Sequence, residues 1–318
     1  MTREYPIGKA NLEVFSDTLQ GLAGNDRDII VVTSDSRGSG KLIPFGELFP
    51  DQIIEIGIAE QNLVGVSAGL ASAGKKVFAV SPACFLTARA LEQIKNDIAY
   101  SDHPVKLIGI SAGVSYGALG STHHSLHDYA ALRAINNLTV LAPADNFETR
   151  QSIELAREMD SPLYIRFGKK PMPHLHGENT EFVIGKGIRV KDGDDLAIIA
   201  TGECVFPALL AAENLEKGHG MKIRVISMHT VKPLDRDILA EAATACRGII
   251  TVEEHSVHGG LGEACAAYLL QNGYAKPFRI IGIPNEYTVS GSQTEIFNHY
   301  GITGEGIAET ALNLINIL

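Results

Sequence analysis

The chain has 318 residues, of which 45% are hydrophobic and 20% are charged, a composition typical of soluble globular proteins. At roughly 100–200 residues per domain, this length predicts two domains or three small ones. The formal charge of −10 argues against nucleic acid or an anionic membrane as the main partner. The start, Met1 to Pro6, lacks the apolar stretch of a signal peptide, and the four cysteines form no Cys-x-x-Cys pair. We therefore expect a cytoplasmic protein without a zinc knuckle or a redox motif.

Short apolar runs alternate with helix-like stretches through the first half of the chain. Residues 10–22 are predicted to be a helix, because Leu12, Phe15 and Leu19 recur at a spacing of three to four. The other predicted helices are 59–73, 85–99 and 148–159, and the predicted strands are 29–33, 53–56, 77–80, 106–111, 138–141 and 163–166. Strands separated by helices imply βαβ units and mostly parallel sheets.

A shift in composition over residues 168–195, rich in proline, histidine and lysine, predicts a linker. The alternation then restarts, with strands at 196–201, 221–227, 248–252 and 278–283 and helices at 206–217, 236–246 and 262–271. We therefore predict an α/β fold with two doubly wound domains, residues 1–180 and 190–318.

Two short motifs can be compared with known site signatures, and the first of them fails. Residues 38–41 resemble part of a phosphate-binding Walker A loop, but Leu42 and Asp35 stand where that motif needs Ser/Thr and its first Gly. Residues 109–113 fit G-x-S-x-G around Ser111 and follow a predicted strand. A hydrolase nucleophile must also open a helix, whereas the following residues are typical of a loop. A serine hydrolase that uses Ser111 stays as the less favoured alternative.

The densest polar cluster is the run 121–128, with three histidines within five residues. It follows a predicted strand, and ligands bind at the carboxyl ends of parallel strands in open α/β folds. His123 and His127 have a helical spacing that could hold a metal, but no Glu lies between them and no third ligand is identifiable. Ser121 or Thr122 could also cap a following helix.

Glu60 opens the predicted helix 59–73 directly after a short strand. A carboxylate in the first turn commonly complements the helix dipole. The apolar neighbours Ile56, Ile58 and Leu63 suggest instead that Glu60 is partly buried. Burial raises the pKa of a carboxyl group and suits it to proton transfer.

Residues 57–62, Gly-Ile-Ala-Glu-Gln-Asn, followed by a helix of small residues, resemble the thiamine-diphosphate enzymes of the transketolase family. Residues 120–124 resemble the family motif Gly-x-Thr-His-Gln, with His124 in the place of Gln. Further resemblances follow in the family order at 104–105, 143–146, 231–235, 251–255 and 259–262. The resemblance spans nearly the whole chain and implies a pyrimidine-binding domain followed by the family's C-terminal domain with its mixed sheet.

The resemblance also implies roles in cofactor binding and catalysis. Glu60 matches the glutamate that hydrogen-bonds the N1′ nitrogen of the aminopyrimidine and favours the imino tautomer that removes the thiazolium C2 proton. Phe85 lies near the aromatic segment that stacks on the pyrimidine, and Asp35 matches an aspartate near the cofactor.

Substrate contacts are implied in the same way. His123 matches a histidine, counted with the catalytic residues, that contacts the hydroxyls of the sugar. Arg166 matches an arginine that binds substrate phosphate, and Ser39 a phosphate-binding serine. The chain departs from family transketolases in three places, where an Asp, an Arg and a His are replaced at or near Leu119, Gly8 and Ser111. These departures speak against ordinary pentose-phosphate substrates.

The family's Mg²⁺ site, a Gly-Asp-Gly pattern followed by a spaced Asn, has only the near match Asp192-Gly193-Asp194. The diphosphate-binding domain and the Mg²⁺ ligands are therefore expected on another polypeptide. We predict the C-terminal subunit of a split transketolase, which moves a two-carbon ketol unit from a ketose phosphate to an aldose. It would act as a dimer within a heterotetramer with the diphosphate-binding subunit. The β-subunit of a 2-oxoacid dehydrogenase and a non-catalytic assembly subunit remain as alternatives.

Overall fold

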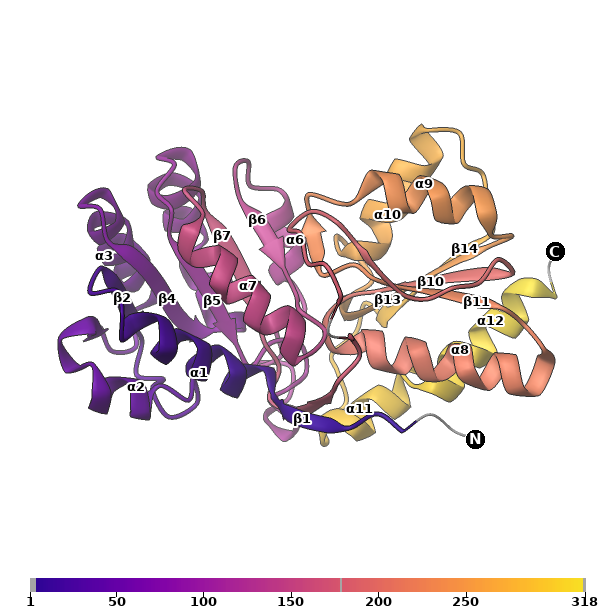
Figure 1. The fold of residues 1–318 in the computed structure, drawn as a ribbon, viewed down its shortest axis with the longest axis horizontal. Helices are drawn as coiled ribbons and strands as arrows, with labels where there is room; N and C mark the ends of the chain where they lie inside the picture. Colours follow the sequence, from indigo (N-terminus) through magenta and orange to yellow (C-terminus); the bar gives the residue numbers. More distant parts are fainter. Residues whose placement is uncertain (1–3, 178, 317–318) are drawn as a thin grey trace.

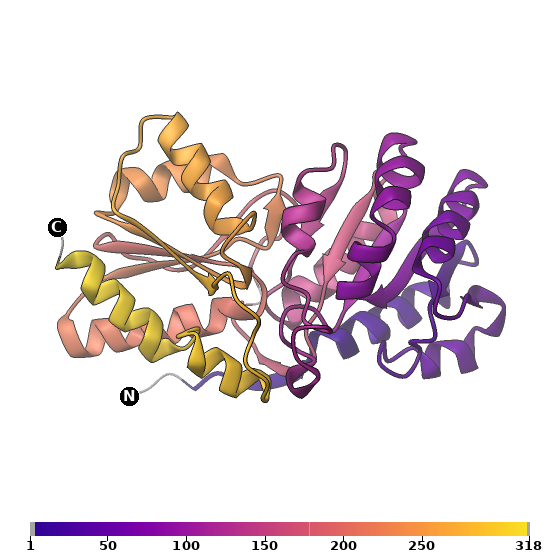
Figure 2. The same cartoon turned by 180° about the vertical axis from the view of Figure 1, so that it is seen from behind.

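The computed structural model describes residues 4–177 and 179–316. The chain forms two lobes that lie side by side, the first from the indigo-to-magenta half and the second from the orange-to-yellow half (Figure 1). Each lobe has a sheet with helices on both faces, as the view from behind also shows (Figure 2). The predicted α/β fold, with helices on both faces of each of two sheets, is therefore confirmed.

The first sheet has seven strands, six of them parallel. Its order is β12 (Thr230–Lys232), β6 (Thr139–Leu141), β7 (Leu163–Arg166), β5 (Lys106–Ile110), β4 (Lys76–Pro82), β2 (Ile29–Thr33) and β3 (Ile53–Glu55). The inner strands β2 and β5 are buried along their whole length and mostly apolar, because helices cover both of their faces. The antiparallel edge strand β12 comes from the second half of the chain, so the two lobes share one sheet.

Helices α1 (Asn11–Ala23) and α7 (Asn146–Glu158) cover one face of this sheet, with α2 (Ile43–Leu48) beside them. Leu12, Phe15 and Leu19 of α1 pack into the core there, as their spacing predicted. The other face carries α3 (Glu60–Ser72), α4 (Ala83–Arg89), the π-helix η2 (Ile94–Tyr100) and α6 (Asp128–Arg133). Short turns of helix complete the lobe: η1 (Pro50–Gln52), α5 (Leu91–Gln93) and η3 (Gly117–Leu119).

The second sheet has the order β14 (Phe278–Ile283), β13 (Ile249–Ser256), β10 (Leu196–Ala200), β11 (Ile223–Ser227) and β9 (Ile188–Lys191). Only β9 is antiparallel in this sheet, so it is mixed as expected. One face packs against α8 (Val205–His219) and α12 (Gly304–Ile315), and the other against α9 (Arg236–Ala245) and α10 (Leu261–Gln271). The short η4 (Gly202–Cys204) and α11 (Gln293–His299) complete this lobe.

Several local predictions need correction. The helix predicted at 85–99 is interrupted, since α4 ends at Arg89 and the chain continues through α5 and the π-helix η2. The predicted linker contains β8 (Pro171–Pro173), which pairs with β1 (Ile7–Ala10), and it also contains β9. Ser121 and Thr122 cap no helix, because α6 begins at Asp128 with His127 as its N-cap residue.

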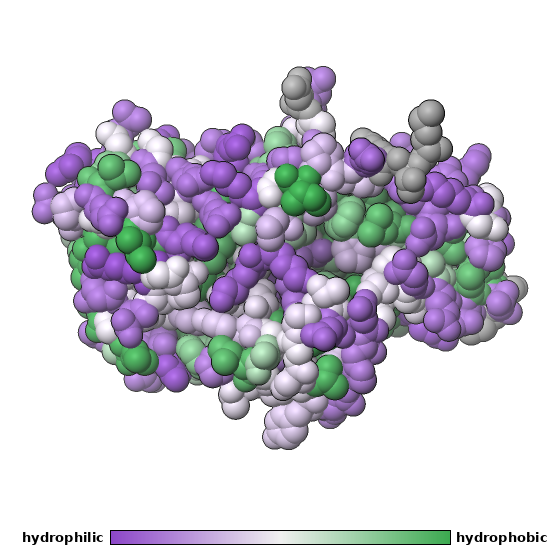
Figure 3. All heavy atoms as spheres, turned by 90° about the horizontal axis from the view of Figure 1, so that it is seen from below, coloured by the Kyte–Doolittle hydropathy of each residue, from purple (hydrophilic) through white to green (hydrophobic). Residues whose placement is uncertain are grey.

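Other global expectations concern sulfur chemistry and membranes. All four cysteines are free and buried. Within residues 4–177 and 179–316, no helix is both long and apolar enough to cross a bilayer. On the face seen from below, apolar residues lie in small groups among hydrophilic ones (Figure 3). The start of the chain, Met1 to Arg3, lies outside the described residues.

Candidate active site

Glu60 lies where β3 ends and α3 begins, at the carboxyl edge of the first sheet. Its side chain is 3% exposed, which confirms the expected burial. Both of its carboxylate oxygens accept from one nitrogen of Arg89, Nη1, at 3.0 Å. These two residues line a hollow of about 610 Å³ together with Ile58, Ala59, Gln61 and Asn62. The buried Glu60 carboxylate therefore borders an open hollow, and Arg89 is its one side-chain hydrogen-bond partner among the described residues.

Arg89 joins this carboxylate to the predicted stacking residue. Its guanidinium carbon lies 4.3 Å from the centroid of the Phe85 ring, a cation–π geometry. Phe85 and Arg89 are four residues apart in α4, so their side chains share one face of the helix. The Arg89 side chain is 47% exposed, so it can leave Glu60 without leaving a buried gap. Arg89 was not among the predicted site residues, although its spacing from Phe85 was readable.

The row of contacts that runs from Glu60 through Arg89 to Phe85 continues at His123. Its ring stands edge-on to Phe85 and to Tyr116, with centroid distances of 5.3 and 5.4 Å. The Lys169 ammonium lies 4.7 Å from the centroid of the Tyr116 ring, and partial burial lowers the pKa of Lys169. The structure therefore brings together the predicted residues Glu60, Phe85 and His123, and it adds Tyr116 and Lys169, for which the sequence carried no motif.

Arg166, the predicted phosphate ligand, has a different setting. Its side chain is 5% exposed, and Nη1 donates to both oxygens of Asp128 at 2.8 and 3.1 Å. Nη2 donates to the backbone oxygen of Glu254 at 2.9 Å, and the guanidinium lies over the Tyr129 ring. These contacts tie the first lobe to the second. Both terminal nitrogens of Arg166 already have protein partners and the side chain is little exposed, and its predicted contact with phosphate stays a prediction.

Asp35 and Ser39 lie in the connection between β2 and α2. Asp35 has φ 48° and an exposed side chain, and its backbone N–H donates to Glu55 Oε1 at 2.5 Å. The Ser39 hydroxyl donates to the Ser36 carbonyl at 3.2 Å. Among the described residues, no hydrogen bond or ring contact joins Asp35 or Ser39 to Glu60, Phe85 or His123. Their predicted roles stay predictions.

His124 and His127 lie on the same segment as His123. Residues 121–127 form turns and irregular chain with a single bridge at Ser125, so the spacing of His123 and His127 is not helical as the metal alternative assumed. His127 lies 3.5 Å from the Thr87 hydroxyl, and His124 is buried. No group of three or more His, Cys, Asp or Glu side chains suited to a metal ion occurs in the part of the chain that the structure describes.

Ser111 and the Asp-Gly-Asp run also have structural positions. Ser111 follows β5 with φ 53°, is fully buried, and has no histidine hydrogen-bonded to its Oγ among the described residues. The chain continues as turns rather than a helix, which argues against a hydrolase elbow. Asp192 and Asp194 lie in the turn between β9 and β10, where a Cβ on Gly193 would lie 2.4 Å from the Ile223 backbone.

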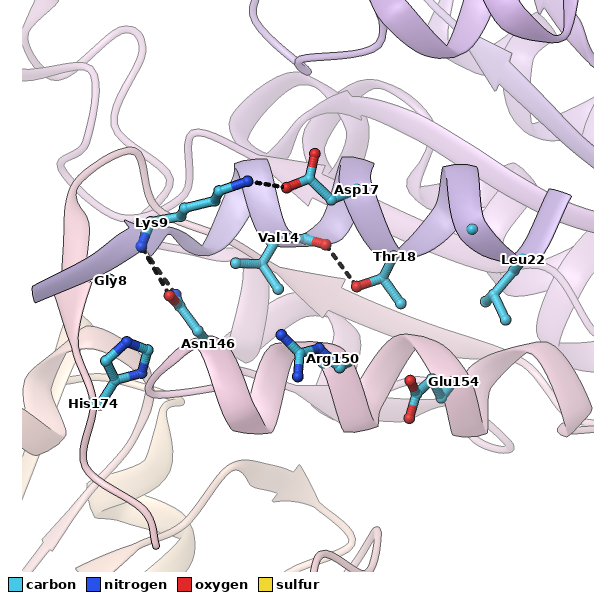
Figure 4. A pocket seen from close by; sticks show the side chains of 11 residues that line it. Gly8, Lys9, Val14, Asp17, Thr18, Leu22, Asn146, Arg150, Glu154 and His174 are labelled. Carbon is cyan, nitrogen blue, oxygen red and sulfur yellow. Dashed lines mark hydrogen bonds and ion pairs between the residues drawn. The ribbon is translucent and has the colours of Figure 1, made fainter. Parts of the chain in front are cut away.

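A second hollow of about 500 Å³ lies between α1 and α7, away from these residues (Figure 4). Its polar groups are partly paired, with Lys9 Nζ 2.6 Å from Asp17 and the Lys9 N–H bonded to Asn146. Gly8 passes so close that a Cβ would lie 2.2 Å from Asn146 Oδ1. An arginine at this position, as family transketolases have nearby, would require the side chains of Asn146 and His174 to move. None of the predicted site residues lines this hollow.

Two family models of known proteins match this chain. Residues 8–173 match the family model described as transketolase, pyrimidine binding domain, and residues 185–307 match transketolase, C-terminal domain. The chain belongs to the transketolase family. Residues 8–173 contain every residue of the row from Glu60 to Lys169.

Relatives of the transketolase family with the same extent are known. The chain is 48% identical to a subunit of the apulose-4-phosphate transketolase of Phocaeicola vulgatus, covering 95% of this chain and 96% of the relative. It is 38% identical to a putative transketolase C-terminal section of Methanocaldococcus jannaschii, covering 97% of each. The solved structure described as "Split gene transketolase, inactive beta4 tetramer" has a TM-score of 0.86 and 34% identity, covering 97% of this chain and 99% of that chain.

A longer transketolase chain shares the fold over about half of its length. A transketolase structure from Pichia stipitis matches 98% of this chain but only 48% of its own, with a TM-score of 0.81 and 23% identity. This chain therefore matches nearly the whole length of the relatives and the split-gene structure named above, and about half of the Pichia stipitis chain.

Proposed function

We propose that this chain is the pyrimidine-binding and C-terminal subunit of a split, thiamine-diphosphate-dependent transketolase. The reaction moves a two-carbon ketol unit from a ketose phosphate to an aldose. The observation that carries the proposal is Glu60, a 3%-exposed carboxylate that faces the hollow at the carboxyl edge of a transketolase-family sheet. Two relatives named as subunits of apulose-4-phosphate transketolases support the reaction class and the split arrangement.

The residues around Glu60 suit an aminopyrimidine. When bound, thiamine diphosphate supplies the electron sink for cleavage and formation of the carbon–carbon bond. Glu60 would exchange its contact with Arg89 for the N1′ nitrogen of the pyrimidine and hold a proton there. Phe85 offers an aromatic face beside it, and Asp35 is retained as a residue near the cofactor. Mg²⁺ would be held by the partner subunit.

The substrate would lie along the continuation of the row. We assign His123 to the sugar hydroxyls, because its ring is partly exposed next to Phe85. Lys169 fits the phosphate better than Arg166, since Arg166 is committed to Asp128 whereas the Lys169 ammonium lies over the ring of Tyr116. Ser39 stays a candidate for a second phosphate contact.

The assembly follows from the need for a diphosphate-binding domain. We infer a heterotetramer in cytoplasmic carbohydrate metabolism, with two copies of this chain and two diphosphate-binding subunits. Within this chain, residues 1–180 would bind the pyrimidine end, and residues 190–318 would form the C-terminal domain.

Reconstitution tests the proposal. The chain is mixed with a diphosphate-binding subunit, thiamine diphosphate and Mg²⁺, and ketol transfer between a ketose phosphate and an aldose is measured. We expect turnover in the mixture and none from either subunit alone. Turnover by this chain alone would contradict the split arrangement. Decarboxylation of 2-oxoacids in place of ketol transfer would favour the 2-oxoacid dehydrogenase alternative.

A further inference from the structure

The loop that follows β5 carries His123, and it is held at its base by the second lobe. Ser125 N–H donates to the Gly113 carbonyl at 2.7 Å, which closes the loop. The N–H of Val114 donates to Glu254 Oε1, on strand β13, at 2.9 Å. Glu254 is itself fixed, because the amide of Gln293 donates to the same oxygen at 2.8 Å.

The tip of the loop is held by a second contact with the same lobe. Thr288, 8% exposed, lies in the segment between β14 and α11, which runs beside the loop (Figures 1 and 2). Its hydroxyl lies 2.6 Å from Nδ1 of His124 and 2.9 Å from the Ser121 hydroxyl. His124 Nε2 faces the Gly117 carbonyl at 2.9 Å, so this nitrogen must carry the proton, and Nδ1 accepts from Thr288.

The two lobes approach each other closely at two glycines of the loop. Gly113 has φ +59°, and a Cβ there would lie 2.1 Å from the Glu254 carboxyl carbon. A Cβ on Gly117 would lie 2.8 Å from the Gly291 carbonyl oxygen. The position of the loop is therefore set by the second lobe as much as by β5.

We propose that Thr288 and Glu254 of the second lobe are positioning residues for His123, which hold residues 113–125 so that the His123 ring faces the site. The proposal rests on the substrate role given to His123 in the proposed function. His123 itself is held only loosely, by ring contacts with Phe85 and Tyr116 and by the hydroxyl of Thr122. Its neighbour His124 is the fixed point, and small displacements of a substrate-orienting group are costly.

The contacts of Thr288 and Glu254 with residues 113–125 form a clamp on the loop. Hydrogen exchange of the isolated chain tests this clamp and needs no enzymatic activity. Thr288→Val removes the hydroxyl at nearly constant volume and leaves His124 Nδ1 without its donor. We expect the amides of residues 113–125 to exchange about tenfold faster, as the loss of one buried hydrogen bond implies. Thr310→Val is the matched control, because it removes a hydroxyl that bonds only Gly306 within α12. Unchanged exchange of the loop in Thr288→Val would overturn the proposal.

Kinetics of the reconstituted complex test the link to His123. We expect Thr288→Val to raise KM for the ketose phosphate about tenfold with a smaller change in kcat, and Thr288→Ser to restore the wild-type value. In a His123→Ala background, Thr288→Val should add nothing. An effect of equal size in that background would overturn the positioning role. A complex without ketol transfer in any variant would instead refute the proposed function, while the exchange result would still decide whether the clamp exists.

Discussion

The two sheets both carry buried glutamates at the carboxyl ends of their strands, in different surroundings. Glu60, after β3, is bound by the side chain of Arg89, which is 47% exposed beside a hollow. Glu253, in β13, accepts from the backbone N–H groups of Leu261 and Gly262 at 2.7 and 2.8 Å. Those two groups belong to the first turn of α10, and burial raises the pKa of Glu253 to about 7.

The difference lies in what each partner can do. The N–H groups at the start of a helix cannot leave a carboxylate unless the helix unwinds, so Glu253 is a fixed structural group. An arginine with a half-exposed side chain can rotate into water, so Glu60 can change its partner. Burial alone therefore does not separate the two glutamates; the half-exposed partner and the open hollow are what distinguish Glu60 from Glu253.

Glu60→Gln gives the largest expected effect. Gln keeps the size of the side chain but cannot take up or release a carboxyl proton, which the role proposed for Glu60 requires. We expect kcat of the reconstituted complex to fall about 100-fold or more, with nearly unchanged stability of the isolated chain. Steady-state ketol-transfer rates and a thermal melt measure the two quantities.

Two variants sharpen this result. Glu253→Gln should lower Tm, because its amide would face an N–H group of α10, and should leave kcat per folded complex near wild type. Glu309→Gln, on the exposed face of α12, should change neither. Full activity of Glu60→Gln would remove Glu60 from the mechanism and favour the non-catalytic assembly alternative.

Arg166→Met gives the next largest effect, and it appears in stability. The variant leaves Asp128 fully buried with the hydroxyl of Tyr164, at 2.7 Å, as a remaining donor. Loss of one member of a buried ion pair costs about 3–5 kcal/mol, which corresponds to a Tm lower by about 10 °C. Circular dichroism melts of the isolated chain measure it. A wild-type Tm combined with weaker binding of the ketose phosphate would restore Arg166 as a substrate ligand.

The fold could be predicted where the hydrophobic pattern is regular. Residues 29–33 are a continuous apolar run, and they form β2 with every residue buried. The pattern of α12 was also readable, since Ile307, Ala311 and Leu314 recur at helical spacing and are buried, but this helix was not among the predicted elements. The interruption of the helix after Arg89 could not be seen, because Ile94 and Ile98, buried in the π-helix, are four residues apart and also fit one face of an α-helix.

The site could be predicted only where a motif carries it. Glu60 and His123 came from such motifs, and the structure places both in the same row of contacts. The sequence around Arg166 does not show whether Arg166 or Lys169 faces the site. Arg166 is the last residue of β7, so the alternation of side chains along the strand cannot be extended to Lys169. The contacts of Arg166 with Asp128 and the nearness of Lys169 to Tyr116 depend on tertiary packing.

Lys169→Met tests the phosphate contact proposed for the Lys169 ammonium in the first lobe. We expect KM for the ketose phosphate to rise about tenfold with little change in Tm, because one charge-assisted contact with phosphate is lost. The matched control is Lys170→Met, since the adjacent Lys170 instead contacts the Thr294 hydroxyl at 2.5 Å. Equal effects of the two variants on KM would show a general loss of positive charge rather than a phosphate contact.

Glu203→Gln has the smallest expected effect. It tests the pair of buried carboxyls, Glu203 and Glu254, at the carboxyl end of the second sheet. The amide of Gln293 donates to Glu203 and to Glu254 at 2.8 Å each, and burial raises the pKa of both carboxyls, that of Glu254 to about 8. The folded state therefore binds protons more tightly than the unfolded chain, so this pair should lower stability as pH rises from about 4.5 toward 8.

The variant removes one of the two charges but keeps an oxygen to accept from Gln293. We expect Tm of the wild type to fall over this pH range, and Tm of Glu203→Gln to fall less and to exceed wild type by about 2–4 °C at pH 8. Glu309→Gln should follow the wild-type slope. If Glu203→Gln also keeps that slope, the raised pKa values of the two carboxyls do not depend on each other. Packing alone, and not a proton bound between them, would then stabilise the carboxyl end of the second sheet.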